Sequence, residues 1–273
     1  MNDASVQPWG QAATGQRLPV LSFDSVAKSF GAATAESEAI RNVDLDVRSG
    51  EFVAIVGPSG CGKSTLLQIA AGLMPASSGE VRLNGAPVTR PPEGMVYLFQ
   101  QYSRSLMPWL TTEENVRFGF QHLRKGSPRE NAERCRRYLG MVGLAEFGTH
   151  YPWQLSGGMQ QRVAIARALA AEPRVLLMDE PFSSVDALTR IELHELLLGL
   201  WAQAGFTVVL VTHDVDEAVY LSDRIALLTR RPAEVAELFT NPLPRPRDPV
   251  ESRDDPRFLE LRHELLSRLL RRP

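Results

Sequence analysis

A glycine-rich stretch of the chain combines the residue types that hold phosphate groups. It reads GPSGCGKST at residues 57–65, follows the apolar segment FVAIV and precedes the helical pattern TLLQIAAG. This strand, loop and helix context is the one that a phosphate loop requires, because glycines let backbone N–H groups turn inward around a phosphate. The candidate binding residues are Gly57, Pro58, Ser59, Gly60, Cys61, Gly62, Lys63, Ser64 and Thr65. We expect Lys63 to reach the β- and γ-phosphates and the Ser64 hydroxyl to ligate magnesium.

Two carboxylates end the apolar segment RVLLMDE at residues 174–180. Ligands of α/β sheets bind at the carboxyl ends of the strands, so Asp179 and Glu180 should face the same phosphates. We expect Asp179 to hold magnesium through water. Phosphoryl transfer to water needs a positioned nucleophile, and we expect Glu180 to accept the proton of that water.

Two further polar side chains follow apolar segments. The segment TVVLVTHD at residues 207–214 contains His213 at its end, where an imidazole can contact a γ-phosphate or order the attacking water. Gln100 follows the segment YLF, and an amide oxygen there can ligate magnesium and release it when the loop moves. On chemistry alone, the neighbouring Gln101 is equally eligible.

A second potential phosphate-binding element reads LSGGMQQR at residues 155–162. Ser156 is expected to cap a helix that starts near Gly158, which leaves N–H groups at Gly157 and Gly158 and the positive helix end pointing outward. A plain capped helix is the alternative. Two phosphate-binding ends so far apart in one chain make sense if the second serves the nucleotide of another chain.

The elements around these motifs indicate the fold. From 155 to about 229, helical patterns alternate with buried strands, which predicts a parallel sheet covered by helices. Short alternating segments between 20 and 89 predict a small, partly antiparallel sheet, and residues 100–153 have a polar helical pattern. We therefore expect an α/β phosphate-loop NTPase core with a small antiparallel β subdomain and a helical subdomain.

Composition limits the class of protein. The chain has 273 residues, is 44% hydrophobic and carries a formal net charge of −2, so no overall basic field favours nucleic acid as a partner. Of two cysteines, Cys61 lies inside the glycine-rich loop, which argues against a disulfide framework and fits a reducing compartment. No apolar run approaches the roughly 18 residues that a membrane helix needs, and the first residues lack the pattern of a secretory signal. We expect a cytoplasmic protein whose membrane contacts go through a partner.

Taken together, these motifs resemble the nucleotide-binding subunit of ATP-binding cassette transporters over about residues 21–240. GPSGCGKST resembles the Walker A motif, RVLLMDE the Walker B motif and LSGGMQQR the signature motif, while SSVD at 183–186 resembles the D-loop. The resemblance implies that Phe30 stacks on adenine, that Asp186 lies near the nucleotide, that Gln100 is the Q-loop glutamine and that His213 is the switch histidine.

The same resemblance implies cofactors, partners and boundaries. ATP and Mg²⁺ would bind between two copies arranged head to tail, with integral membrane permease subunits docked on the helical subdomain at the cytoplasmic face of the inner membrane. A periplasmic or extracellular solute-binding protein would act indirectly. The implied units are a flexible leader at 1–17, a cassette domain at 18–240 with a helical subdomain at about 101–158, and a proline-rich linker with a C-terminal helix at 241–273. Six leucines there (259, 261, 265, 266, 269 and 270) form an apolar stripe that should dock on the chain's own domain, with a partner contact as the alternative.

Within the family, RPPEGMVYLFQ followed by LMPWLTTEENVRFGF is similar to importers of nitrate, sulfonate and taurine. Tyr102, Leu106, Met107 and Trp109 are then expected to line a groove for the permease. The long segment QYSRS, Gln101 and the D-loop SSVD depart from the usual pattern, which leaves the solute open. The alternatives are a cassette ATPase of another transport class or a nucleic-acid maintenance ATPase. The sequence lacks the heptad runs and CxxC motifs that the latter carries.

Overall fold

A six-stranded sheet in the order β10-β9-β3-β8-β7-β6 carries the predicted phosphate-binding strands. This computed structural model describes residues 19–31, 37–100, 105–121 and 126–270. Five strands run parallel, and the sixth, β10 (Val235–Thr240), pairs antiparallel with β9. The parallel strands are β3 (Phe52–Val56), β6 (Met95–Leu98), β7 (Val175–Asp179), β8 (Thr207–Thr212) and β9 (Arg224–Leu228).

The central strands are apolar because helices or another sheet cover both of their faces. Every residue of β3, β7 and β8 is buried, as parallel strands of α/β proteins require. Alternate residues of β3 enter different cores: Phe52 and Ala54 join one cluster, and Val53 and Ile55 join the other. Ligands can therefore reach this sheet only at the ends of its strands.

On one face, the sheet is covered by α1 (Lys63–Ala70) and a second sheet in the order β2-β1-β4-β5. Its strands β1 (Pro19–Ser29), β2 (Glu38–Arg48), β4 (Ser78–Leu83) and β5 (Ala86–Pro87) pair antiparallel. The predicted antiparallel sheet is confirmed. The segment FVAIV, which interrupts it in the sequence, instead forms β3 of the parallel sheet.

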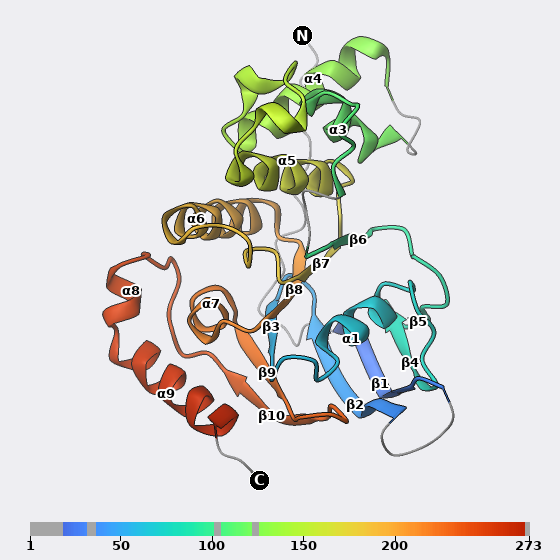
Figure 1. Ribbon diagram of the computed structural model, residues 1–273, viewed down its shortest axis with the longest axis vertical. Helices are drawn as coiled ribbons and strands as arrows, with labels where there is room; N and C mark the ends of the chain where they lie inside the picture. The colour runs from blue at the N-terminus through green and yellow to red at the C-terminus, as the bar shows by residue number, and fades with distance from the viewer. Residues whose placement is uncertain (1–18, 32–36, 101–104, 122–125, 271–273) are drawn as a thin grey trace.

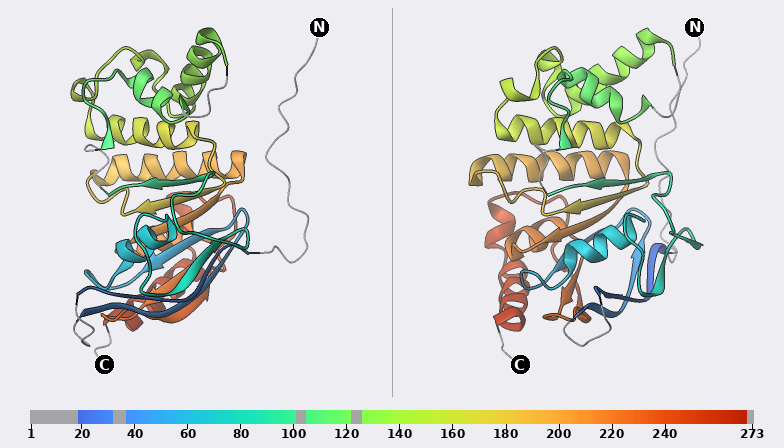
Figure 2. Two further views of the ribbon diagram at one scale, coloured as in Figure 1. Left: turned by 90° about the vertical axis from the view of Figure 1, so that its right-hand side faces the viewer. Right: turned by 45° about the vertical axis from the view of Figure 1, so that its right-hand side comes forward.

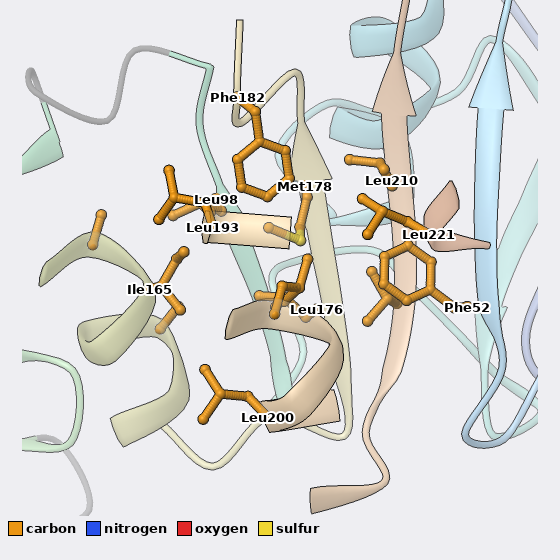
Figure 3. Packing of buried hydrophobic residues seen from close by; sticks show 14 of the residues in the cluster. Phe52, Leu98, Ile165, Leu176, Met178, Phe182, Leu193, Leu200, Leu210 and Leu221 are labelled. Carbon is orange, nitrogen blue, oxygen red and sulfur yellow. The ribbon is translucent and has the colours of Figure 1, made fainter. Parts of the chain in front are cut away.

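The other face is covered by α5 (Gly157–Ala170), α6 (Ala187–Ala204), α7 (Val215–Leu221) and α9 (Pro256–Leu270). Figures 1 and 2 show α3 (Thr112–Phe118), α4 (Pro128–Met141) and α5 as a helical layer at one end of the molecule, with α6 between that layer and the sheet. In Figure 3, Leu193 of α6 and Ile165 of α5 lie near Met178 of β7 and Phe182. The helical layer thus shares one apolar core with the sheet.

Two capping boxes and two short 3-10 turns define the helical layer. Thr111 and Glu114 cap the start of α3, and Ser127 and Glu130 cap the start of α4, each side chain bonding the backbone of the other residue. The turns η3 (Ala145–Phe147) and η4 (Pro152–Gln154) then lead to α5. The predicted domain boundaries stay a prediction, and the leader at 1–17 lies outside the described residues.

The C-terminal helix docks on its own chain. After the short helix α8 (Glu251–Asp254), α9 buries Phe258, Leu261 and Leu265 against α7, and Arg262 pairs with Asp216 at 2.5 Å. Leu266 and Leu269 are partly buried, whereas Leu259 and Leu270 are exposed. The apolar stripe therefore docks as expected over its middle, with the addition of Phe258.

None of the helices in the described ranges is long and apolar enough to span a bilayer.

Candidate nucleotide-binding and hydrolysis site

The glycine-rich loop connects β3 to α1 and has the backbone shape of an anion cradle. Gly60 and Gly62 have φ values of 74° and 123°, which only glycine adopts at low cost. No side chain caps α1, so the N–H groups of its first turn remain available to a phosphate. Lys63 is buried, and its Nζ donates to the carbonyl oxygens of Gly57 at 2.9 Å and Pro58 at 3.0 Å. These two bonds hold the Lys63 ammonium group against the carbonyl groups at the start of the loop.

Cys61 contributes to this loop through packing and backbone. Its side chain is buried, and a Cβ at Gly57 would lie 3.1 Å from the Cys61 sulfur. Burial is the main cause that raises the pKa of the Cys61 thiol. The thiol therefore stays protonated beneath the loop, and any phosphate contact at this position would be made by the backbone.

Asp179, the last residue of β7, receives a hydrogen bond at each carboxylate oxygen. Ser64 Oγ donates to Oδ1 at 2.8 Å, and the Tyr97 hydroxyl donates to Oδ2 at 2.8 Å. Burial raises the pKa of Asp179, and the two hydrogen bonds oppose that shift. Burial and the neighbouring Asp179 raise the pKa of Tyr97, so its hydroxyl remains a donor.

This oxygen set fits magnesium that is bound together with a nucleotide. Mg²⁺ prefers oxygen ligands and usually takes one or two from protein, with phosphates and water supplying the rest. The Ser64 hydroxyl and the Asp179 carboxylate supply that number and face each other. Within the described ranges no cluster of three or more His, Cys, Asp or Glu could form an all-protein site.

Glu180 follows Asp179 at the end of β7, and its side chain contacts residues that follow the two neighbouring strands. Its Oε2 lies 3.0 Å from Gln100 Nε2, beyond β6, and 3.0 Å from His213 Nδ1, beyond β8. Its backbone has φ 44°, a left-handed conformation that costs a non-glycine residue about 1–3 kcal/mol and clusters at functional sites. The Glu180 N–H donates to Val211 of β8, and the Ser183 hydroxyl donates to the Glu180 carbonyl. These bonds hold the strained turn in place.

The LSGGMQQR stretch forms a separate helix start, away from the glycine-rich loop. Ser156 is the N-cap of α5, and its Oγ accepts from the Met159 N–H at 3.3 Å. Ser156 and Gly157 are exposed. A Cβ at Gly158 would lie 2.5 Å from Thr189 Cγ2, so only glycine lets α5 pack against α6 there. Figures 1 and 2 place α5 and α1 on opposite sides of β6 and β7.

Asp186 and Phe30 take part in none of the loop contacts described above. Asp186 is the N-cap of α6, and bonds from Thr189 lower the pKa of its carboxyl. Phe30 follows β1 with its side chain 44% exposed, and Lys28 Nζ lies 5.4 Å from the ring centroid. Each is accessible to a ligand from outside.

Two sets of supporting residues could not be found from the motifs. Tyr97 contacts Asp179 only because β6 and β7 are neighbours in the sheet. Behind Glu180, His194 Nε2 of α6 lies 2.9 Å from Glu217 Oε1 of α7, with both side chains buried. The Phe182 ring meets the His194 ring edge-on at 4.8 Å between centroids. The sequence gives no sign of these contacts, because they depend on which strands and helices become neighbours in the fold.

Comparison with known proteins identifies the family. The chain matches the family model described as ABC transporter over residues 40–183. It is 43% identical to the nitrate import ATP-binding protein NrtD of Synechococcus elongatus over 92% of both chains. It is 42% identical to the bicarbonate transport ATP-binding protein CmpD of the same species, over 93% of this chain and 91% of that one.

A solved structure agrees in fold. The dimeric structure of a post-hydrolysis state of the ATP-binding cassette MJ0796, bound to ADP and Pi, superposes with a TM-score of 0.70 at 36% identity. It covers 81% of this chain and 98% of that chain. The chain belongs to the ABC transporter family, in which it is an ATP-binding, ATP-hydrolysing subunit.

Proposed function

We propose that the chain powers import of a small oxyanion through a membrane permease, by ATP-driven closure of a head-to-tail dimer. The observation that supports a dimer is that the two helix starts proposed to bind phosphate lie far apart within one chain. The helix α1, which begins at Lys63, lies on one side of β6 and β7, while α5, which Ser156 caps, lies on the other side in the helical layer. Two copies arranged head to tail would place each cap over the partner's cradle.

In this proposal the residues have separate roles in ATP binding and hydrolysis. The loop N–H groups and Lys63 bind the phosphates, and the Phe30 ring stacks on adenine. Ser64, Asp179 and Gln100 hold magnesium, which neutralises charge on the phosphates when it is bound. Glu180 accepts the proton of the attacking water, and His213 orients the Glu180 carboxylate through their 3.0 Å contact. Asp186 and Ser156, with Gly157 and Gly158, act across the dimer interface.

The solute is proposed from the relatives and the sequence resemblance. The names of the two relatives specify nitrate and bicarbonate, and the motifs of this chain resemble importers of nitrate, sulfonate and taurine. All of these solutes carry a small oxygen-rich acid group. The permease subunits, and a solute-binding protein acting through them, would select among the solutes. The chain itself would lie at the cytoplasmic face of the membrane.

A groove beside Gln100 supports a permease contact. It has a volume of about 730 Å³ and is mostly apolar, with Val96, Leu98, Phe99, Met107 and Phe118 among its lining residues. Of the docking residues expected from the sequence, Met107 lines this groove and Trp109 is 72% exposed. Leu106 is only 3% exposed and packs in the core, so its expected docking role is wrong. Tyr102 lies outside the described residues.

The test is reconstitution of the chain with its membrane subunits in liposomes that enclose the chain and ATP, with the solute and its solute-binding protein added outside. We expect ATP-dependent uptake of nitrate, bicarbonate, a sulfonate or taurine. The Lys63→Ala variant should lose uptake, because a charge-assisted phosphate contact is worth about 1.5–3 kcal/mol. ATP hydrolysis without uptake of any of these oxyanions would overturn the proposed solute class.

A further inference from the structure

Tyr97 is placed where three elements of the nucleotide site meet. It lies on β6, whose backbone pairs in register with β7, with Tyr97 opposite Leu177 and Leu98 opposite Met178. Its hydroxyl donates to Asp179 Oδ2 at 2.8 Å and is bonded by the side chain of Gln68 on α1. The helix that starts with Lys63 and Ser64 is thus connected to Asp179 through the Tyr97 hydroxyl.

Binding of magnesium and nucleotide would affect the two hydrogen bonds at Asp179 differently. Ser64 Oγ donates to Oδ1 and is itself a magnesium ligand in the proposed function, so that bond must be exchanged when the metal binds. Tyr97 donates to the other oxygen, Oδ2, and its bond can persist. A donor fixed on one oxygen sets the orientation of the carboxylate and leaves Oδ1 directed at Ser64.

We propose that Tyr97 is a positioning residue of the magnesium site, which holds Asp179 Oδ2 so that Oδ1 and Ser64 face the metal together. The proposal rests on the proposed function, in which Asp179 and Ser64 hold magnesium. Groups that orient metal ligands commonly change metal affinity 10–100-fold when they are removed. Gln100 follows two residues after the end of the same strand, so β6 helps to position both the carboxylate and the glutamine.

The experiment removes the hydroxyl alone, with Tyr97→Phe in the full chain. A fluorescent ATP analogue is titrated at fixed concentration with Mg²⁺, and its affinity is also measured in EDTA. We expect the Mg²⁺ concentration for half-maximal tight binding to rise about tenfold. Affinity in EDTA should stay within about twofold, because the phosphate loop is unchanged.

The matched control is Tyr220→Phe. The Tyr220 hydroxyl also donates to a carboxylate, that of Glu195 at 2.5 Å, but it lies on α7 and contacts neither Ser64 nor Asp179 among the described hydrogen bonds. This variant should leave the Mg²⁺ requirement unchanged.

Three outcomes would overturn the inference. These are an unchanged Mg²⁺ requirement in Tyr97→Phe, equal losses of affinity with Mg²⁺ and in EDTA, or the same rise in Tyr220→Phe. The second outcome would indicate a purely structural role, and a lowered melting temperature would accompany it. Failure of the proposed function looks different, because the wild-type chain itself would then show no Mg²⁺ dependence.

Discussion

His213 Nδ1 lies 3.0 Å from Glu180 Oε2, and Gln100 Nε2 lies 3.0 Å from the same oxygen. The three residues follow three neighbouring strands, β8, β7 and β6. The His213 side chain is 55% exposed and that of Glu180 is 18% exposed, so solvent reaches the imidazole more easily than the carboxylate. Glu180 is therefore held from two sides, as a group that must keep its orientation during proton transfer would be.

The first prediction concerns the basicity of Glu180. Glu180→Gln keeps the shape of the side chain and removes its ability to accept a proton. ATP hydrolysis should fall by about 10²–10⁴, the usual contribution of a general base, while ATP affinity stays intact. Steady-state phosphate release and nucleotide titration measure the two effects. Turnover within threefold of wild type would remove Glu180 from this role.

The second prediction concerns the stability cost of Asp179. Burial raises the pKa of its carboxyl above the ordinary value of 3.8, so folding favours the protonated form. The contribution of Asp179 to the free energy of unfolding is therefore most favourable below the ordinary pKa of 3.8. It falls as pH rises through the raised pKa of the folded state. Once the pH exceeds the raised pKa the penalty is fully present, and Asp179→Asn removes it.

Nucleotide-free Asp179→Asn should thus melt at a higher temperature than wild type at pH 7. The difference between the two proteins should shrink as pH falls through the raised pKa of Asp179, because the wild-type carboxyl then becomes protonated. Thermal unfolding across this pH range measures it. A variant that melts lower than wild type at pH 7 would show that the bonds from Ser64 and Tyr97 outweigh the burial of charge.

The local structure around the proposed phosphate-binding residues could be predicted from the sequence because their contacts are local. Lys63 bonds carbonyl groups of its own loop, and Ser156 caps its own helix, so spacing along the chain suffices. Asp179 and His213 were predictable because each ends an apolar strand. Tyr97 and the His194–Glu217 pair were not, because their partners are set by which strands and helices become neighbours. Leu106 was misjudged for a related reason: apolar residues beside a loop can equally turn into the core.

The third prediction tests the buried pair behind Glu180. His194→Leu leaves the Glu217 carboxylate buried without its partner, which typically costs about 3–5 kcal/mol. Denaturant unfolding measures the loss. The double variant His194→Leu/Glu217→Leu should recover much of that stability, since removing both partners leaves no unpaired polar group. Additive losses in the two single variants and the double variant would show that the pair is not coupled.

The fourth prediction concerns docking to the permease. Met107→Ser and Trp109→Ala should reduce recruitment to membranes that contain the permease more than they reduce ATP hydrolysis by the isolated chain. The control is Trp153→Ala, since Trp153 is 70% exposed in the same helical layer but is far in sequence from the groove residues, whereas Trp109 is two residues from Met107, which lines the groove. Sedimentation with such membranes separates the variants. Equal binding by all three variants and wild type would exclude this groove as the docking site.

The fifth prediction tests whether Ser156 serves the partner's nucleotide. Ser156 and Gly157 are exposed at the start of α5, and the Ser156 hydroxyl with the N–H groups of Gly157 and Gly158 should gain an anionic partner only when a γ-phosphate approaches from another chain. Closure should then depend on the differential affinity that this one phosphate supplies, since ADP lacks it. In a Glu180→Gln background, ATP should trap a dimer on gel filtration, whereas ADP should leave a monomer.

Adding Ser156→Arg to that background should abolish the trapped dimer, because the larger side chain fills the place of the partner's phosphate. Affinity of the monomer for ATP should stay within about twofold, since Lys63 and the glycine-rich loop are untouched. Ser156→Ala is the milder companion variant and should weaken the dimer without abolishing it. If Ser156→Arg instead eliminates ATP binding by the monomer, Ser156 acts on the nucleotide of its own chain, and the head-to-tail arrangement loses its support.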